Sequence, residues 1–380
     1  MSKVSVRSTA LEPPAGTPLL RRATTVYGLV ILLVLFAGIF SALLPHTFPT
    51  WLNFRLNAGG KSVLILLALA VTVPMIAGKI DLSVGYAVGL WHILALTFQT
   101  RYHLPWWLAC LCVLALGAMV GAFNALLVEL AQVDAFIATL ATGLVLNGFV
   151  FFHTNGEQQL DKPSTPNIFK QIGYWSLGGR RGVPGPFVVA VVLGVVMYVV
   201  LEYLPVGRYL YAVGANPRSA ELAGIPRRKY IIGAFMVSGV ITAFAGIVLQ
   251  ARQNTGQANV GPDLLFPALV AAFLGSTTIR PGRVNPLGTL VGIAISVVGL
   301  SGLIQQFPGR DNWLTPVFNG LTLMAAIVIA STATRRRLNA AERVGADRAS
   351  LPPGDAPPPR TGSHAGSAPN GLTHTDGRDA

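Results

Sequence analysis

Ten apolar runs, each about as long as a membrane-spanning helix, are the feature of this sequence that most restricts its fold. A helix needs about 20 residues to cross the hydrocarbon core of a bilayer. The composition agrees, because 52% of the 380 residues are hydrophobic and 11% are charged, whereas soluble domains carry about 25% charged residues. We therefore predict an all-α polytopic membrane protein with about ten transmembrane helices, at residues 24–44, 61–78, 82–100, 105–131, 135–153, 186–204, 230–251, 263–279, 287–305 and 313–331.

The segments outside these runs define the expected domain organisation. Residues 1–23 form a basic N-terminal segment and residues 24–334 form the transmembrane domain. Residues 335–380 are rich in proline, glycine, serine and alanine without apolar periodicity, which predicts a disordered tail. Lysine and arginine near the spans are more frequent on the side of the N-terminus, so we expect both termini in the cytoplasm. The run 263–279 is short and contains Pro267, which predicts a broken or re-entrant helix.

Several patterns that often carry chemistry are incomplete in this chain. The net charge of +13 comes from residues scattered through short loops, without the basic face typical of nucleic-acid binding. Gly60-Lys61-Ser62 ends like a phosphate-binding loop, but Arg55 occupies the place of that loop's first glycine. The histidines show no metal-ligand spacing and no nucleophile set is evident. We expect no nucleic-acid partner, no metal, no cofactor bound by this chain and no enzymatic activity.

The stretch GKIDLSVG, residues 78–85, places two opposite charges between two long apolar runs. One interpretation is a capped turn on the cytoplasmic side, with Lys79 ending one helix and Asp81 beginning the next as its N-cap. The other is a break deeper in the membrane, beside a solute path. There Lys79 and Asp81 would pair, because residues two apart share a face in extended backbone.

Two polar stripes interrupt the apolar runs. Thr139, Gly143 and Asn147 recur every four residues and therefore share one helix face. A similar stripe in the last run consists of Thr315, Asn319 and Thr322. Such stripes serve either helix packing or the lining of a translocation path. Neutral hydroxyl and amide groups suit a neutral polyol, and the scarcity of charge in the spans argues against a proton-coupled pump.

Two glycine pairs at matching places indicate close helix contacts. Gly85-x-x-x-Gly89 and Gly288-x-x-x-Gly292 each follow a charged turn. Small residues four apart let helices approach closely. The correspondence also allows an internal duplication.

The longest polar segment between two runs on the expected cytoplasmic side is residues 206–233. Asn216-Pro217 is a favourable helix start and Gly224 a natural stop, so a short helix is expected between them. An exposed short helix is either a solvated connector or a docking element for a cytoplasmic partner.

Four segments in order resemble the permease subunits of ribose-type ABC sugar importers, and together they cover about residues 45–335. They are GKIDLSVG (78–85), VDAFIATLATGLVLNGFVFFHTNG (133–156), RYLYAVGANPRSAELAGI with the following SGVITAFAGIVLQAR (208–252), and LVAAFLGSTTIRPGRVNPLGTLVG (269–292). The resemblance implies an ABC permease in a bacterial cell membrane that translocates a small neutral solute of the monosaccharide class, driven by ATP. It also implies four partners or surroundings: a cytoplasmic ABC ATPase that carries ATP and Mg²⁺, an external solute-binding protein, a second permease copy or paralogue, and membrane lipid.

The resemblance assigns roles to particular residues. The ATPase is expected to dock at a coupling loop, with matching positions Gly214, Asn216, Ala220, Glu221 and Gly224. The translocation path is expected to include Asp81, Ser83, Gly85, Thr139, Asn147 and Asn319.

The chain departs from the family pattern at a few places. Lys79 replaces a usual glycine, Gly275-Ser276 replaces a glycine pair, and PDLLFPAL (262–269) differs from the usual segment. These departures leave the solute open. An ABC permease for nucleosides or branched-chain amino acids is one alternative, and a self-sufficient secondary transporter is another.

Overall fold

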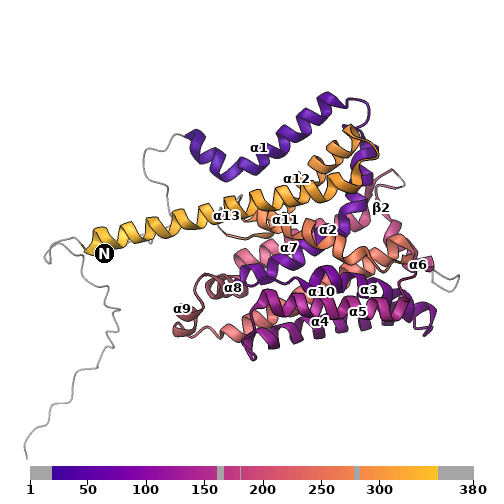
Figure 1. Cartoon of the computed structure of the whole chain (residues 1–380), viewed down its shortest axis with the longest axis horizontal. Coiled ribbons are helices and arrows are strands. Elements are labelled where there is room, and N and C mark those ends of the chain that lie inside the picture. Colours follow the sequence, from indigo (N-terminus) through magenta and orange to yellow (C-terminus); the bar gives the residue numbers. More distant parts are fainter. Residues whose placement is uncertain (1–18, 161–166, 180, 278–282, 350–380) are drawn as a thin grey trace, which may run out of the picture. The chain divides into compact units, whose positions relative to one another are not determined.

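The computed structural model describes residues 19–160, 167–179, 181–277 and 283–349, and it is built almost entirely from helices (Figure 1). Each of the ten predicted runs coincides with one helix. Seven of these helices are long and apolar enough to cross a membrane, and α11 and part of α1 are shorter apolar helices. The ten are α1 (Leu19–Leu43), α2 (Trp51–Ile76), α3 (Ser83–Thr100), α4 (Trp106–Glu129), α5 (Ala135–Thr154), α7 (Gly185–Tyr203), α10 (Arg227–Gln253), α11 (Val260–Gly275), α12 (Pro286–Gln306) and α13 (Asp311–Ala349).

In the part of the chain that the structure describes, three further helices lie between these ten. They are α6 (Asn167–Tyr174), α8 (Pro205–Ala215) and α9 (Pro217–Leu222). Two short antiparallel pairs complete the described fold: β1 (Gln159–Leu160) with β4 (Thr255–Gly256), and β2 (Ser176–Leu177) with β3 (Val183–Pro184).

Helix α2 forms the centre of the bundle. Its residues from Leu66 to Val71 are fully buried, and it packs against α7, α10, α11 and α12. The helix begins at Trp51, ten residues before the predicted run, so the Gly60-Lys61-Ser62 motif lies within a helix and not in a loop. Its geometry therefore excludes a phosphate-binding loop there, as the sequence indicated.

Glycines allow the closest helix contacts. A Cβ on Gly117 of α4 would lie 2.5 Å from the carbonyl oxygen of Gly239 in α10. The two predicted glycine pairs both face α11, because Gly85 abuts Leu265 and Gly288 abuts Gly275. Helix α11 is continuous through Pro267, so it is short but not broken.

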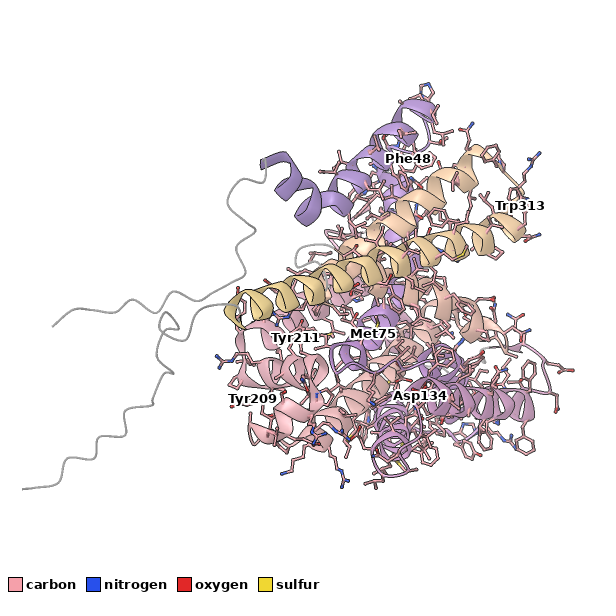
Figure 2. All side chains as sticks on the ribbon, turned by 60° about the vertical axis from the view of Figure 1, so that its left-hand side comes forward. Phe48, Met75, Asp134, Tyr209, Tyr211 and Trp313 are labelled. Carbon is pink, nitrogen blue, oxygen red and sulfur yellow. The ribbon has the colours of Figure 1, made fainter. Side chains whose placement is uncertain are left out.

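Two ends of the bundle can be distinguished. The end of α2 lies against α8, whereas the start of α2 binds the segment between β2 and β3, where Arg55 Nε donates to the carbonyl oxygen of Gly182 (3.0 Å). We call these the α9 end and the Trp51 end. Figure 1 shows α8 and α9 at one end and α6 and β2 at the other. In Figure 2, Tyr209 and Tyr211 lie at the α9 end, away from Phe48.

The chain separates into two compact units, Met1–Thr334 and Arg335–Ala380, which is where the tail was expected to begin. Helix α13 runs through this boundary to Ala349, so helix and not irregular chain occupies residues 335–349. Most of the expected N-terminal segment, and the tail beyond residue 349, lie outside the described residues.

Candidate coupling and translocation site

The expected short helix in the 206–233 segment is present as α9, and its ends have the predicted chemistry. The side chain of Asn216 caps the helix by accepting a hydrogen bond from the backbone N–H of Ser219 (3.0 Å). Pro217 is the first helical residue. Gly224 has a φ of +79°, and the following N–H of Ile225 donates to the carbonyl of Ala220 (3.0 Å), which closes the helix end.

One face of α9 is buried and the other is open. Ala220 is 4% exposed, Glu221 is 51% exposed and Leu222 is 85% exposed. A leucine this exposed on a polar, capped helix was not singled out from the sequence, because a single apolar residue in a loop carries no periodic signal. It gives the otherwise polar helix an apolar tip.

Glu221 connects α9 to the ends of two long helices through ion pairs. Its carboxylate lies 3.4 Å from Nε of Arg227, the first residue of α10. Nη2 of Arg227 also donates to Oε2 of Glu129, the last residue of α4, at 2.8 Å. Glu129 is 1% exposed and Arg227 25% exposed. The Glu221–Arg227–Glu129 triad therefore joins an exposed carboxylate to a buried one.

Gly214 serves a different purpose, namely close packing of α8 on α2. A Cβ on Gly214 would meet the carbonyl oxygen of Ile76 at the end of α2. Gly78, with a φ of +76°, in turn faces the carbonyl oxygen of Gly214. The expected coupling loop thus directly contacts the start of the GKIDLSVG segment.

Helix α8 was missed in the sequence and holds a second connection. The hydroxyl of Tyr211 donates to the carbonyl of Val284 (2.8 Å), and the guanidinium of Arg283 lies 3.5 Å above the Tyr211 ring. Arg283 also pairs with Glu202 of α7 at 3.8 Å. The segment before α12 is therefore held against α8.

The GKIDLSVG segment turns back into the bundle. Asp81 is 1% exposed. Its Oδ1 accepts from the N–H (3.0 Å) and the hydroxyl (2.6 Å) of Ser83, and its Oδ2 accepts from the hydroxyl of Ser238 (3.0 Å). Ser238 lies 11 residues (238 minus 227) beyond the start of α10, about 16 Å along that helix. Asp81 is therefore an interior group.

Two more side chains complete this buried polar cluster. Nδ2 of Asn124 on α4 donates to the hydroxyl of Ser83 (2.9 Å). The hydroxyl of Thr139 on α5 accepts from the N–H of Leu82 (3.0 Å). The cluster thus draws on α3, α4, α5 and α10. Asn124 and Ser238 were not predicted, because a single polar residue in an apolar run shows no partner in sequence.

The structure decides between the two interpretations of GKIDLSVG. The N-cap of α3 is Leu82 and not Asp81 as predicted, although the Asp81 carboxylate still accepts from the N–H of Ser83, the first helical residue, and residues 81–85 are buried in the bundle. The proposed Lys79–Asp81 pair is wrong: among the described residues, the hydrogen-bond partners of the Asp81 carboxylate are Ser83 and Ser238. Both carboxylate oxygens accept hydrogen bonds from serine donors, and the side chain of Lys79 is half-buried outside this cluster.

The other predicted path residues are dispersed. Gly85 packs α3 against Leu265 of α11. Asn147 is partly buried on α5 and Asn319 is buried on α13. Within the described part of the chain, no hydrogen bond joins Asn147 or Asn319 to the Asp81 cluster. Asp81, Ser83 and Thr139 are therefore brought together, and the rest of the predicted path is not.

Comparison with known proteins identifies the family. The family described as "Branched-chain amino acid transport system / permease component" matches residues 59–327. The chain belongs to this permease family. It is similar to the ribose import permease protein RbsC of Haemophilus influenzae, with 31% identity over 70% of this chain and 81% of that protein. It is also similar to RbsC of Escherichia coli K12, with 30% identity over 79% and 92% of the two chains.

A third relative of this permease is named for a different substrate. The autoinducer 2 import system permease protein LsrD of Klebsiella pneumoniae is 29% identical over 84% of this chain and 97% of that protein. No solved structure matches the permease. The permease is thus a multi-pass transport subunit of the bacterial cell membrane, and the motif resemblance in the sequence is confirmed.

Proposed function

We propose that this permease imports a monosaccharide-like neutral solute and is driven by a separate cytoplasmic ATPase that docks on α9. The observation that carries the proposal is the anchoring of α9. A short exposed helix is connected by the Glu221–Arg227–Glu129 triad and by Gly214 to the ends of α2, α4 and α10. A force applied to α9 would reach three buried helices through these contacts.

The solute class rests on the relatives and on the buried groups. The two RbsC proteins are named for ribose import and LsrD for autoinducer 2 import. The buried polar groups of the spans include many hydroxyls and amides, which hydrogen-bond a polyol without trapping it by charge. The description of the family supports a branched-chain amino acid permease as the second candidate.

The remaining parts of the proposed system follow from this assignment. The α9 end faces the cytoplasm, together with both termini, and the Trp51 end faces an external solute-binding protein. ATP and Mg²⁺ act on the ATPase, and this chain holds no cofactor. A second permease copy or paralogue completes the transmembrane unit.

Uptake in cells tests the function. Radiolabelled ribose and leucine are supplied to cells that express the permease with its ATPase and binding protein, or with an ATPase variant that cannot hydrolyse ATP. We expect ribose uptake only with the active ATPase. Equal uptake with the inactive ATPase would refute an ATP-driven importer, and uptake of leucine alone would favour the second candidate.

Docking is tested by copurification of the ATPase. Leu222→Asp places a charge on the exposed tip of α9. Leu177→Asp is the matched control, because Leu177 is also exposed (61%) but lies at the opposite end in β2. We expect only Leu222→Asp to lose the bound ATPase. Glu221→Arg and Gly224→Pro are unsuitable, because the first places a cation beside Arg227 and the second forces proline into a φ of +79°.

A further inference from the structure

A cavity at the Trp51 end is separate from both the coupling loop and the Asp81 cluster. Its volume is about 710 Å³, within the range of roughly 300–1,000 Å³ typical of small-molecule sites. It lies between α2, α7 and α12, and its inner wall is aliphatic, with Ile65, Val191, Ile293 and Val297 among the lining residues.

The outer part of this cavity carries a chain of neutral polar groups. Nδ2 of Asn57 donates to Oδ1 of Asn53 (2.8 Å) and lies 3.0 Å from the hydroxyl of Ser301 on α12. Nε2 of Gln305 donates to Oδ1 of Asn53 at 3.0 Å. Aromatic rings flank these groups, since Trp51 and Phe54 stack with ring centroids 5.0 Å apart.

Hydrogen-bonding capacity remains open toward the cavity. Among the described residues, neither Oδ1 of Asn57 nor the ammonium group of Lys61 has a hydrogen-bond partner, and both residues line the cavity. Asn53, Asn57 and Lys61 are spaced four apart and therefore share one face of α2. Eight residues separate Asn53 from Lys61, so this polar stripe extends about 12 Å along the helix.

Such a stripe is costly against lipid. A lysine in the middle of a spanning helix costs about 2.5–3.5 kcal/mol by insertion scales, and such residues face cavities that hold water or solute. An acyl chain would leave the Lys61 ammonium and the Asn57 carbonyl without partners. The hydroxyls of a polyol satisfy both, and its apolar ring face fits the Trp51–Phe54 pair and the aliphatic wall.

We infer that this cavity is the entrance of the translocation path, and that Asn57 and Lys61 contact the neutral polyol there. The inference rests on the proposed import function and adds a site to it. The solute enters at the aromatic rim, where its hydrogen bonds to water are replaced by hydrogen bonds to Asn57 and Lys61. It then meets the aliphatic wall. The smooth wall offers no group that would hold a polyol tightly.

Cysteine accessibility tests whether the cavity contains water. The two native cysteines, Cys110 and Cys112, are replaced by alanine in the full-length permease, expressed with its ATPase and binding protein. Val191→Cys and Val192→Cys form a matched pair on α7, because Val191 lines the cavity whereas Val192 is 54% exposed on the outer surface and does not line it. Cells are treated with a charged, membrane-impermeant thiol reagent.

We expect Val191→Cys and Asn57→Cys to react about tenfold or more faster than Val192→Cys, because the reactive thiolate forms in water and not in apolar surroundings. Millimolar ribose with its binding protein should slow the reaction at residue 57. Equal labelling rates at residues 191 and 192 would overturn the inference, and so would the absence of labelling at both residue 191 and residue 57. Either result would indicate a cavity filled by lipid or by a second permease copy.

Uptake separates solute contact from simple hydration. Asn57→Leu should lower ribose uptake severalfold while the ATPase still copurifies, and Asn57→Gln should restore part of it. Normal uptake by Asn57→Leu would overturn the contact. The cysteine labelling rates do not depend on transport. They therefore still show whether the cavity contains water, even if uptake proves independent of ATP and the proposed function fails. Failed labelling with ATP-dependent uptake would reject the entrance and leave the proposed function intact.

Discussion

The loss of Arg227 is expected to be the most damaging single change in the proposed coupling region. Arg227→Met removes the cation that faces Glu129, whose carboxylate is 1% exposed and 2.8 Å from Nη2 of Arg227. Removing one partner of a buried ion pair costs about 3–5 kcal/mol. Because Arg227 is 25% exposed, water can reach part of the site, so we expect about 3 kcal/mol, the lower end of that range.

The neighbouring changes should rank in a fixed order. Glu129→Gln removes the buried charge and keeps an acceptor for Arg227, so its cost is about 1–2 kcal/mol. Glu221→Gln alters a carboxylate that is 51% exposed, so its cost is about 0–1 kcal/mol. Arg227 begins α10 and Glu129 ends α4, and each charge is unfavourable at its own helix terminus. The pair is therefore stabilising only through the contact between the helices.

Because the two charges are stabilising only through their contact with each other, a double variant that removes both is informative. Arg227→Met with Glu129→Leu removes both charges and keeps side-chain volume, an exchange that is often neutral or stabilising for buried pairs. We expect it to regain most of the stability lost by Arg227→Met alone. Reversible unfolding in mixed detergent micelles, followed by tryptophan fluorescence, measures these differences, and about 3 kcal/mol is roughly a 100-fold change in the unfolding equilibrium.

Two results would refute this reasoning. If Glu129→Gln were as destabilising as Arg227→Met, the buried charge would not be the source of the cost. If the double variant stayed as unstable as Arg227→Met, the two residues would not act as a pair. Glu221→Gln should leave unfolding nearly unchanged while lowering ATP-driven uptake, which separates coupling from stability in the same triad.

Three further changes probe the GKIDLSVG segment. Lys79→Gly should leave both folding and uptake unchanged, because Lys79 does not pair with Asp81; a clear loss of uptake would show a role that the contacts do not explain. Asp81→Ala should cost about 1–3 kcal/mol in unfolding, since the buried hydroxyl of Ser238 loses its acceptor; no change would mean that the cluster is not stabilising. Thr139→Val keeps the shape but orphans the N–H of Leu82, so about 1 kcal/mol should be lost, and an unchanged unfolding midpoint would contradict this.

The sequence predicted the spanning helices because long apolar runs are sufficient to define them. It misplaced the start of α2, where Asn53, Arg55 and Asn57 make residues 51–60 look like a loop although they are helical. Those polar residues are tolerated in the helix because they face the cavity or the β2–β3 segment, not lipid. Whether polar side chains are tolerated on a helix depends on what the helix packs against, and the neighbours of α2 could not be known from the sequence.

Local chemistry and tertiary contacts were predictable to different degrees. The ends of α9 followed from Asn216, Pro217 and Gly224, whose preferences act within a few residues. The contacts of the Asp81 cluster could not be predicted, because Asn124, which donates to Ser83, and Ser238, which donates to Asp81, are distant in sequence and are brought together by the packing of α4 on α10. The resemblance to ribose-type permeases emphasised Asp81 without indicating what it contacts.

The contact between Gly78 and Gly214 gives the Asp81 cluster its place in the proposed coupling. A displacement of the coupling loop can reach α10 only if the segment between them is rigid, because a flexible segment would change its own conformation instead. The GKIDLSVG segment meets the coupling loop at Gly78 and is fixed to α10 through Asp81. The hydrogen bonds that make a buried aspartate tolerable therefore also make the segment a stiff connection. On this view, Asp81 acts by holding the segment in position and not by contact with the solute, which agrees with the protein donors that bond to both of its oxygens.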